Sequence, residues 1–177
     1  MILEHSEIIE SDIDGTIIDI EFIGHFNRFF SADDSRRYKD IKLVIFGFIN
    51  RESLNVYCAK GMESVPELNI KTSEVISNLK RPFYAFHCRV ESSVLFHVLG
   101  HAVPFDGELS SELHENKAKA VRELNIDNYD DPFFNDGNLC TQAWNDLKFE
   151  EAIAHNRACL LKERDILMIR NFRKPND

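Results

Sequence analysis

Residues 41–49 read Ile-Lys-Leu-Val-Ile-Phe-Gly-Phe-Ile (IKLVIFGFI), and this nearly unbroken apolar run decides the fold class. A strand that is apolar at almost every position is expected to be covered on both faces. The polar turn at 50–53 leads into Leu54–Ala59, which is expected to pair with the run as its antiparallel neighbour. The sequence therefore predicts a sheet buried inside a layered domain.

More strands are expected before and after this stretch. Glu7–Glu10 and Thr16–Ile23 are rich in β-forming residues and flank Asp14-Gly15, a dipeptide typical of hairpin turns. Pro82–His87 reads as another buried strand. The second half of the chain has helical patterning, and helices are expected over residues 72–79, 90–99, 111–124, 140–147 and 149–172, with a loop over 126–138.

Strands followed by helices in this order predict an α/β fold, a mixed central sheet flanked by helices. The 177 residues suit a single domain spanning 1–177, and 44% hydrophobic residues, including 14 Phe, suffice for a core. No apolar run reaches the length needed to cross a membrane, and the first ten residues do not resemble a signal peptide, so a cytoplasmic protein is expected. Four widely spaced cysteines without a C-x-x-C pair argue against a zinc knuckle.

The formal charge of −9 argues against a protein that coats nucleic acid through Lys and Arg. It leaves room for a metal-dependent nuclease, because such sites are built from carboxylates. Asp19 and Glu21 alternate in the predicted strand, so both project from one face. Two adjacent acids repel, and they need water, a cation or a raised pKa. A solvated acidic edge strand is the alternative interpretation.

Two further segments carry reactive residues. The stretch YAFHCRVESSVL, residues 84–95, runs from strand to helix and places Glu91 near the helix start, where a Glu also suits the helix dipole. The stretch HNRACLLKE, residues 155–163, places His155 and Cys159 one turn apart on the long terminal helix. A surface or interface role for such a histidine is the competing interpretation.

In this order the segments resemble the motifs of the DEDD superfamily of 3′–5′ exonucleases, in its small prokaryotic branch with a His in the last motif. DIEF at 19–22 corresponds to the D-I-E-T of the first motif, YAFHCRVESSVL to Y-N-G-x-x-F-D-x-x-F-L, and HNRACLLKE to H-N-x-x-D-V-x-x-L. The segment ENKAKAVRELNI at 115–126 loosely matches a further motif, S-L-K-x-V-E-x-x-L-G-I. The likeness covers about residues 17–169 and implies a ribonuclease H-like fold.

The resemblance also implies a function. It predicts a metal-dependent exonuclease acting on a single-stranded nucleic-acid end, with Mg²⁺ or Mn²⁺ held by Asp19, Glu21 and Glu91, and with His155 as general base. The last carboxylate of the family falls at Cys159 or Leu160 here, and sulfur is a poor ligand for Mg²⁺. Glu163, one turn further on, is the candidate substitute ligand; without it, activity is expected to be weak.

Three alternatives remain open. A nuclease-like domain without activity would serve as a binding module for a nucleic-acid end or a protein partner. Asp12-Ile13-Asp14-Gly15-Thr16 resembles the nucleophile loop of haloacid dehalogenase-like phosphatases, although the residues before it are short and polar for a buried strand. His97 and His101 have the H-x-x-x-H spacing of zinc ligands on a helix, although Gly100 interrupts the helix between them.

Overall fold

The structure is a computed structural model that describes residues 1–112 and 115–170. Its strands are β1 (Ile2–Ile8), β2 (Thr16–Ile23), β3 (Lys42–Ile49), β4 (Ser53–Ala59), β5 (Phe83–Ala85) and β6 (Gly107–Glu108). Its α-helices are α1 (Val65–Asn78), α2 (Cys88–Leu99), α3 (Lys117–Glu123), α4 (Gly137–Asn145) and α5 (Phe149–Ile169), and two short 3₁₀ turns are η1 (Ser35–Tyr38) and η2 (Met62–Ser64).

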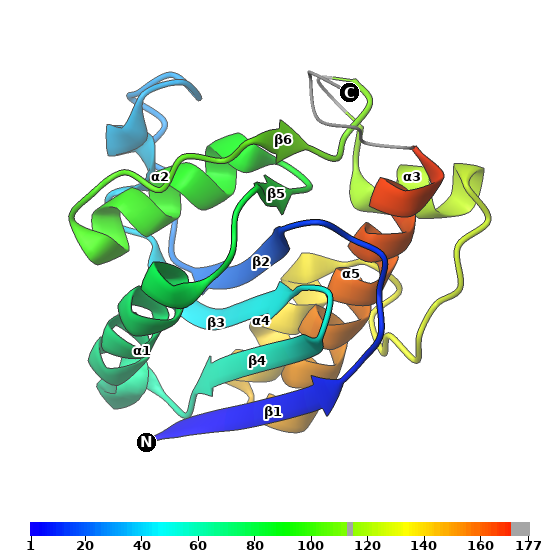
Figure 1. Cartoon of the computed structure of the whole chain (residues 1–177). Coiled ribbons are helices and arrows are strands. Elements are labelled where there is room, and N and C mark those ends of the chain that lie inside the picture. The colour runs from blue at the N-terminus through cyan, green and yellow to red at the C-terminus, as the bar shows by residue number, and fades with distance from the viewer. Residues whose placement is uncertain (113–114, 171–177) are drawn as a thin grey trace.

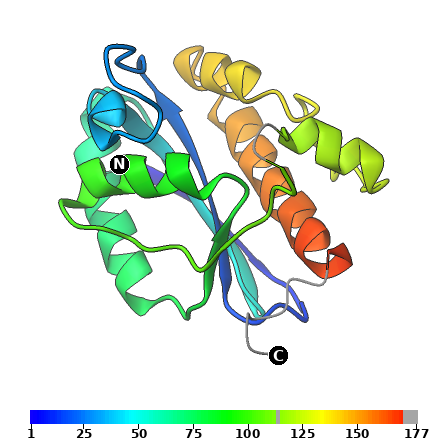
Figure 2. The same cartoon turned by 90° about the horizontal axis from the view of Figure 1, so that it is seen from above.

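All described strands form one mixed sheet in the order β1-β4-β3-β2-β5-β6 (Figure 1). Neighbours run antiparallel from β1 to β2, while β2, β5 and β6 run parallel to one another. Seen from above, α1 and α2 cover one face of the sheet, and α4 and α5 cover the other (Figure 2). This confirms the predicted α/β class with a mixed central sheet, and it is consistent with a ribonuclease H-like fold.

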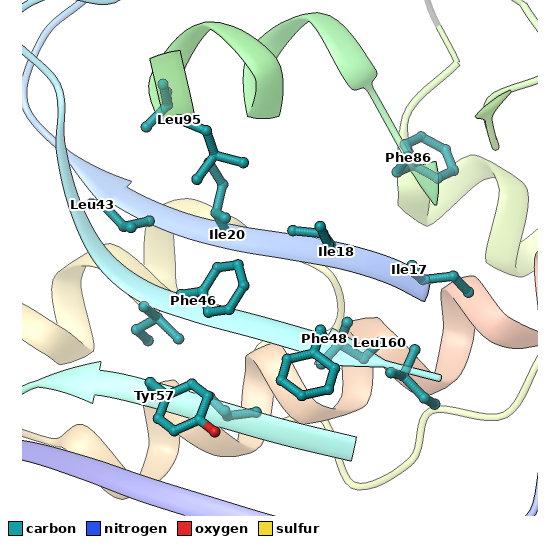
Figure 3. Packing of buried hydrophobic residues seen from close by; sticks show 14 of the residues in the cluster. Ile17, Ile18, Ile20, Leu43, Phe46, Phe48, Tyr57, Phe86, Leu95 and Leu160 are labelled. Atoms are coloured by element: carbon teal, nitrogen blue, oxygen red, sulfur yellow. The ribbon is translucent and has the colours of Figure 1, made fainter. Parts of the chain in front are cut away.

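The core follows from strict alternation along the central strands. Ile18 and Ile20 of β2 lie opposite Phe48 and Phe46 of β3, so these four side chains share the face that α2 covers through Leu95 (Figure 3). Each large apolar side chain buried in this way contributes about 1.5–3 kcal/mol to stability. The intervening residues of β2, Asp19 and Glu21, must therefore point to the opposite face, toward α5.

The predicted hairpin across Asp14-Gly15 is wrong. β1 pairs with β4 at the edge of the sheet and not with β2. Gly15 turns the chain with a φ of +103°, and a Cβ there would lie 2.2 Å from the Pro82 carbonyl oxygen. The glycine is thus required by the close approach of β2 to the segment that begins β5, because Thr16 N–H donates to that same carbonyl.

Several predicted helix boundaries also need correction. α1 begins at Val65 with a proline in its first turn, earlier than the predicted start at residue 72, so Thr72 lies buried inside the helix. α3 is shorter than predicted and is capped by Asn116, while residues 113–114 of the predicted helix lie outside the described residues. α2 ends at Gly100 in the left-handed conformation, as predicted. α4 starts earlier than predicted, and α5 is described to Ile169, with 171–172 outside the described residues.

Within residues 1–112 and 115–170, no helix has both the length and the apolar character needed to span a membrane.

Candidate functional site

A cleft of about 280 Å³ opens beside β2 on the face covered by α5. It brings together residues from β2, α2, α3 and α5. The charged or metal-binding side chains that line it are Asp19, Glu21, His87, Glu91, Lys117, His155 and Cys159. The predicted site residues therefore meet at one place, although they come from segments far apart in the sequence.

Asp19 is held from two sides. Its Oδ2 accepts a hydrogen bond of 2.8 Å from Asn156 Nδ2 on α5. Gly47, directly opposite Asp19 on β3, makes this approach of α5 possible, because a Cβ at position 47 would lie 2.0 Å from Asn156 Oδ1. The absence of a side chain at Gly47 thus allows Asn156 to reach and position Asp19.

Lys117 carries a positive charge into the cluster from the first turn of α3. Its Nζ lies 2.9 Å from Asp19 Oδ1 and 2.6 Å from Glu163 Oε1. Burial alone would lower the pKa of Lys117, but the nearby charges, led by Asp19, outweigh it and raise the pKa well above its ordinary value. No role was predicted for Lys117 from the sequence, because its partners Asp19 and Glu163 lie far from it along the chain.

Glu163 lies in this cluster, one turn beyond Cys159 and fully buried. The candidate substitute carboxylate therefore reaches the site, on the side where Lys117 binds. Burial raises the pKa of Glu163, and the Lys117 ammonium opposes that rise.

Glu91, in the first turn of α2, is, like Glu163, a buried carboxylate that is only partly satisfied. It is 7% exposed, and its Oε2 has no hydrogen-bond partner among the described residues. Burial and then the charge of Asp19 raise the pKa of Glu91 to about 8. The same two causes raise the pKa of Glu21 to about 7, although His155 and Lys117 oppose them. Both carboxyl groups are therefore easier to keep protonated than in water, mainly because they are buried and secondarily because Asp19 lies near them.

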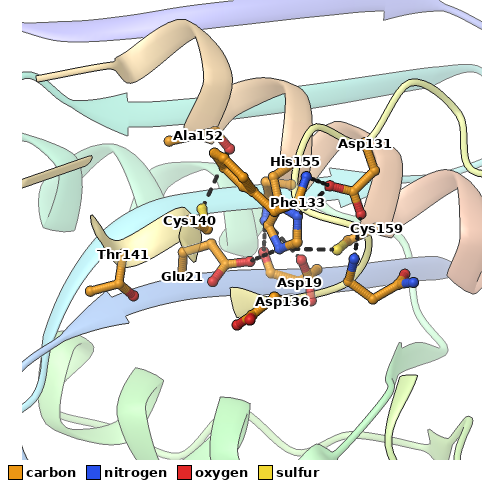
Figure 4. A network of polar contacts seen from close by, with 12 residues as sticks. Asp19, Glu21, Asp131, Phe133, Asp136, Cys140, Thr141, Ala152, His155 and Cys159 are labelled. Atoms are coloured by element: carbon orange, nitrogen blue, oxygen red, sulfur yellow. Dashed lines mark hydrogen bonds and ion pairs between the residues drawn. The ribbon is translucent and has the colours of Figure 1, made fainter. Parts of the chain in front are cut away.

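His155 is oriented by a buried acid. Its Nδ1 lies 2.8 Å from Asp131 Oδ1, while its Nε2 faces Glu21 Oε1 at 3.5 Å (Figure 4). Burial would raise the pKa of Asp131, but hydrogen bonds from His155 and Lys162 outweigh it and lower the pKa. An ionised Asp131 only accepts hydrogen bonds, so the Nδ1 of His155 carries the proton, and the Nε2 of neutral His155 presents a lone pair.

Asp131 is itself fixed from several directions. Lys162 Nζ lies 2.6 Å from its Oδ2, and the backbone N–H groups of Phe133 and Asn135 donate to the same carboxylate. The sequence predicted only a loop for this segment and did not identify Asp131. His155 lines the cleft and is itself only 1% exposed, so the surface role considered from the sequence does not apply to it.

Of the two positions at which the resemblance expects a carboxylate, Cys159 lines the cleft and Leu160 does not. Its Sγ lies 3.6 Å from His155 Nε2, and the two side chains stand one turn apart on α5 (Figure 4). Leu160 instead packs in the apolar core (Figure 3). The ligand-type atoms of Glu21, His155 and Cys159 all lie within 4.8 Å of one another.

The residues of the phosphatase and zinc-site alternatives lie outside the cleft. The Asp12–Thr16 segment follows the edge strand β1 and leads into the start of β2. A phosphatase nucleophile loop requires a central parallel strand before it, and β1 is not such a strand. His97 Nε2 lies 2.7 Å from the Ser35 carbonyl oxygen, and His101 Nδ1 lies 3.3 Å from the Ala102 carbonyl oxygen. These histidines contact the backbone and do not line the cleft.

Comparisons of this chain with protein-family models, with curated proteins and with solved structures found no match. The resemblance to the exonucleases thus rests on the motifs and their order.

Proposed function

We propose that this protein is a metal-dependent phosphodiesterase of the 3′–5′ exonuclease type, acting on single-stranded nucleic-acid ends. The observation that supports this proposal most strongly is the meeting of three carboxylates, from β2 and α2, with an oriented histidine at one cleft, while a fourth carboxylate, Glu163 of α5, is joined to them through Lys117. The mixed sheet beneath them is consistent with the fold that the motif resemblance predicts.

The residues fit a divalent cation. Asp19, Glu21, Glu91 and Glu163 bring four carboxylates, against which Lys117 sets one ammonium. Glu91 keeps an oxygen without a partner, and oxygen is the ligand that Mg²⁺ and Mn²⁺ prefer. Glu21 and Glu91, with Asp19 beside them, would hold such an ion. When bound, it would supply Lewis acidity toward a phosphate oxygen and toward water.

The chain's own residues account for the remaining chemistry. The lone pair of His155 Nε2, held in place by Asp131, accepts the proton of the water that attacks phosphorus. As the P–O3′ bond breaks, the leaving oxygen takes a proton from solvent, and a nucleoside 5′-monophosphate is released. Lys117 offsets the charge of Asp19 and Glu163, so an anionic substrate approaches a less negative site.

A second candidate function, a nuclease-like binding module, is favoured by the position of Lys117. Its ammonium lies between Asp19 and Glu163, and both oxygens of Asp19 are already engaged by Lys117 and Asn156. A cation that needs Asp19 as a ligand would have to displace one of these partners.

A cleavage assay separates the two candidates. Single-stranded DNA and RNA oligonucleotides labelled at the 5′ end are incubated with Mn²⁺ or Mg²⁺, and products are resolved by length. The exonuclease proposal expects a ladder that shortens from the 3′ end. The Asp19→Asn variant should lose at least about a hundredfold in rate, while Glu151→Gln, a carboxylate exposed on α5, should retain it.

Other outcomes reject the exonuclease proposal. Oligonucleotide binding in fluorescence anisotropy without any cleavage would favour the binding module. Neither binding nor cleavage would remove both candidates.

A further inference from the structure

We propose that Glu21, His155 and Cys159 form a site for a borderline divalent cation such as Zn²⁺ or Co²⁺, with a fourth position open to the cleft. The side chains come from β2 and α5, and all three line the same cavity. The inference rests on the geometry of these three residues and does not require the protein to cleave nucleic acid.

The distances suit tetrahedral coordination. Metal–nitrogen and metal–sulfur bonds of about 2.0 and 2.3 Å at a tetrahedral angle separate the two ligand atoms by about 3.5 Å. The His155 Nε2 to Cys159 Sγ distance is 3.6 Å, and the His155 Nε2 to Glu21 Oε1 distance is 3.5 Å. Two of the three distances thus match a tetrahedral site, and the third pair of ligand atoms, on Glu21 and Cys159, lies within 4.8 Å.

The ring nitrogen of His155 that faces away from the proposed ion is held by a carboxylate. Metal-binding histidines usually donate their second ring N–H to a carboxylate, which fixes the tautomer and makes the free nitrogen a better ligand. Asp131 provides this contact to His155 Nδ1 at 2.8 Å, and Lys162 anchors Asp131 in turn at 2.6 Å. This arrangement is an observation independent of the three ligand atoms, and it too points to a metal on Nε2.

The ligand types select the class of ion. A thiolate and an imidazole favour Zn²⁺ or Co²⁺ over Mg²⁺, which binds oxygen. Cys159 loses its thiol proton to solvent when the ion binds, so the bound species is the thiolate. The change from a carboxylate to Cys159 would thus alter which metal the site accepts, instead of only removing a ligand.

Glu91 lines the same cleft as the proposed ion site. Its unpartnered Oε2 is buried in the same cleft. A cation on His155 Nε2 occupies the lone pair that the proposed hydrolysis uses. With such an ion bound, Glu91 becomes the proton acceptor available to a water molecule in the cleft.

Cobalt titration tests the site directly. Tag-free protein is stripped of metal with chelator, and Co²⁺ is added while absorption is recorded. We expect one Co²⁺ per chain, with a thiolate-to-cobalt charge-transfer band in the near ultraviolet that Zn²⁺ abolishes by displacing the cobalt. Cys159→Ser should lose the band, while Cys88→Ala, which removes a thiol outside the cleft, should keep it.

A folded wild-type protein without the band, or a band that survives in Cys159→Ser, would overturn the inference. If Cys159→Ser fails to fold by circular dichroism, Glu21→Gln provides the second test, because Glu21 is partly exposed. It should weaken Co²⁺ binding at least about tenfold, while the exposed control Glu151→Gln should not. An unchanged affinity in Glu21→Gln would also overturn the inference. The cleavage assay is independent, so the failure of one proposal leaves the other intact.

Discussion

The two halves of the cleft hold their charges in different ways. In the half built from Asp19, Lys117 and Glu163, which we call the lysine half, an ammonium lies 2.9 and 2.6 Å from two carboxylates. In the half built from Glu21, Glu91, His155 and Cys159, which we call the histidine half, no such cation is present among the described residues, and the pKa values of both carboxyl groups are raised.

This difference shows that one cluster of acids can contain a cationic side chain on one side and lack one on the other. In the lysine half, the Lys117 ammonium balances one of the two carboxylates, and burial favours the protonated form of the other, Glu163. The histidine half must be neutralised either by protons or by a bound cation. Added metal should therefore act on the histidine half first, and substitutions should affect the two halves differently.

The largest effect is expected when the lysine half is broken. Lys117→Met leaves Asp19 and Glu163 buried without their counter-charge, and loss of one partner of a buried pair typically costs about 3–5 kcal/mol. Urea denaturation should show that loss in the free energy of unfolding.

The matched control is Lys119→Met, two residues along the same helix, where the ammonium pairs with the exposed Glu112. The decrease in the free energy of unfolding caused by Lys119→Met should stay below about 1 kcal/mol. Equal effects of the two substitutions would mean that Lys117 does not serve as the internal cation.

The histidine half should make stability depend on pH. The pKa of Glu91 is about 8 in the folded protein and near 4.5 in the unfolded chain, so the folded state binds this proton more tightly. The resulting stabilisation is fully present below pH 4.5 and is lost as the pH rises toward 8. Without metal, the free energy of unfolding should fall by roughly 2–4 kcal/mol between pH 5 and pH 8.

Glu91→Gln, which cannot ionise, should reduce this dependence in urea denaturation at a series of pH values, and the part contributed by Glu21 should remain. Glu74→Gln, an exposed carboxylate on α1, should leave it unchanged. A wild-type stability that rises between pH 5 and pH 8 would contradict the assigned charge of the histidine half.

A smaller effect is expected from the contact that positions Asp19. Gly47→Ala places a Cβ against Asn156 Oδ1, and overpacking of this kind costs typically about 1–3 kcal/mol. Gly137→Ala is the control, because its nearest neighbour would be Glu21 Oε2 at 3.7 Å. The melting temperature of Gly47→Ala should be well below that of Gly137→Ala. The reverse order would mean that the packing of α5 on β3 does not depend on Gly47.

Patterns of neighbouring residues in the sequence predicted the faces of strands and the ends of helices. The alternation in TIIDIEFI placed Asp19 and Glu21 on one face, and Gly100 marked the end of α2. The partners of β1 were not predictable in this way, because Asp14-Gly15 is a local turn signal, while the pairing with β4 is decided by distant residues.

The candidate site shows the same limit. Asp19, Glu21, Glu91, His155 and Cys159 were found because they belong to recognisable motifs. Lys117 and Asn156 were given no role, since they meet Asp19 from 98 and 137 residues away along the chain. Asp131 was missed because a buried acid in an acidic loop cannot be told from its solvated neighbours without the contact to His155.

The most direct test of the account is a crystal of the protein soaked in Zn²⁺ and, separately, in Mn²⁺, with anomalous diffraction data collected at the edge of each metal. The account predicts a Zn²⁺ peak between Glu21, His155 and Cys159, a Mn²⁺ peak beside Glu21 and Glu91, and Lys117 still paired with Asp19 and Glu163. A cleft without any peak, or a peak between Asp19 and Glu163 with Lys117 displaced, would contradict it.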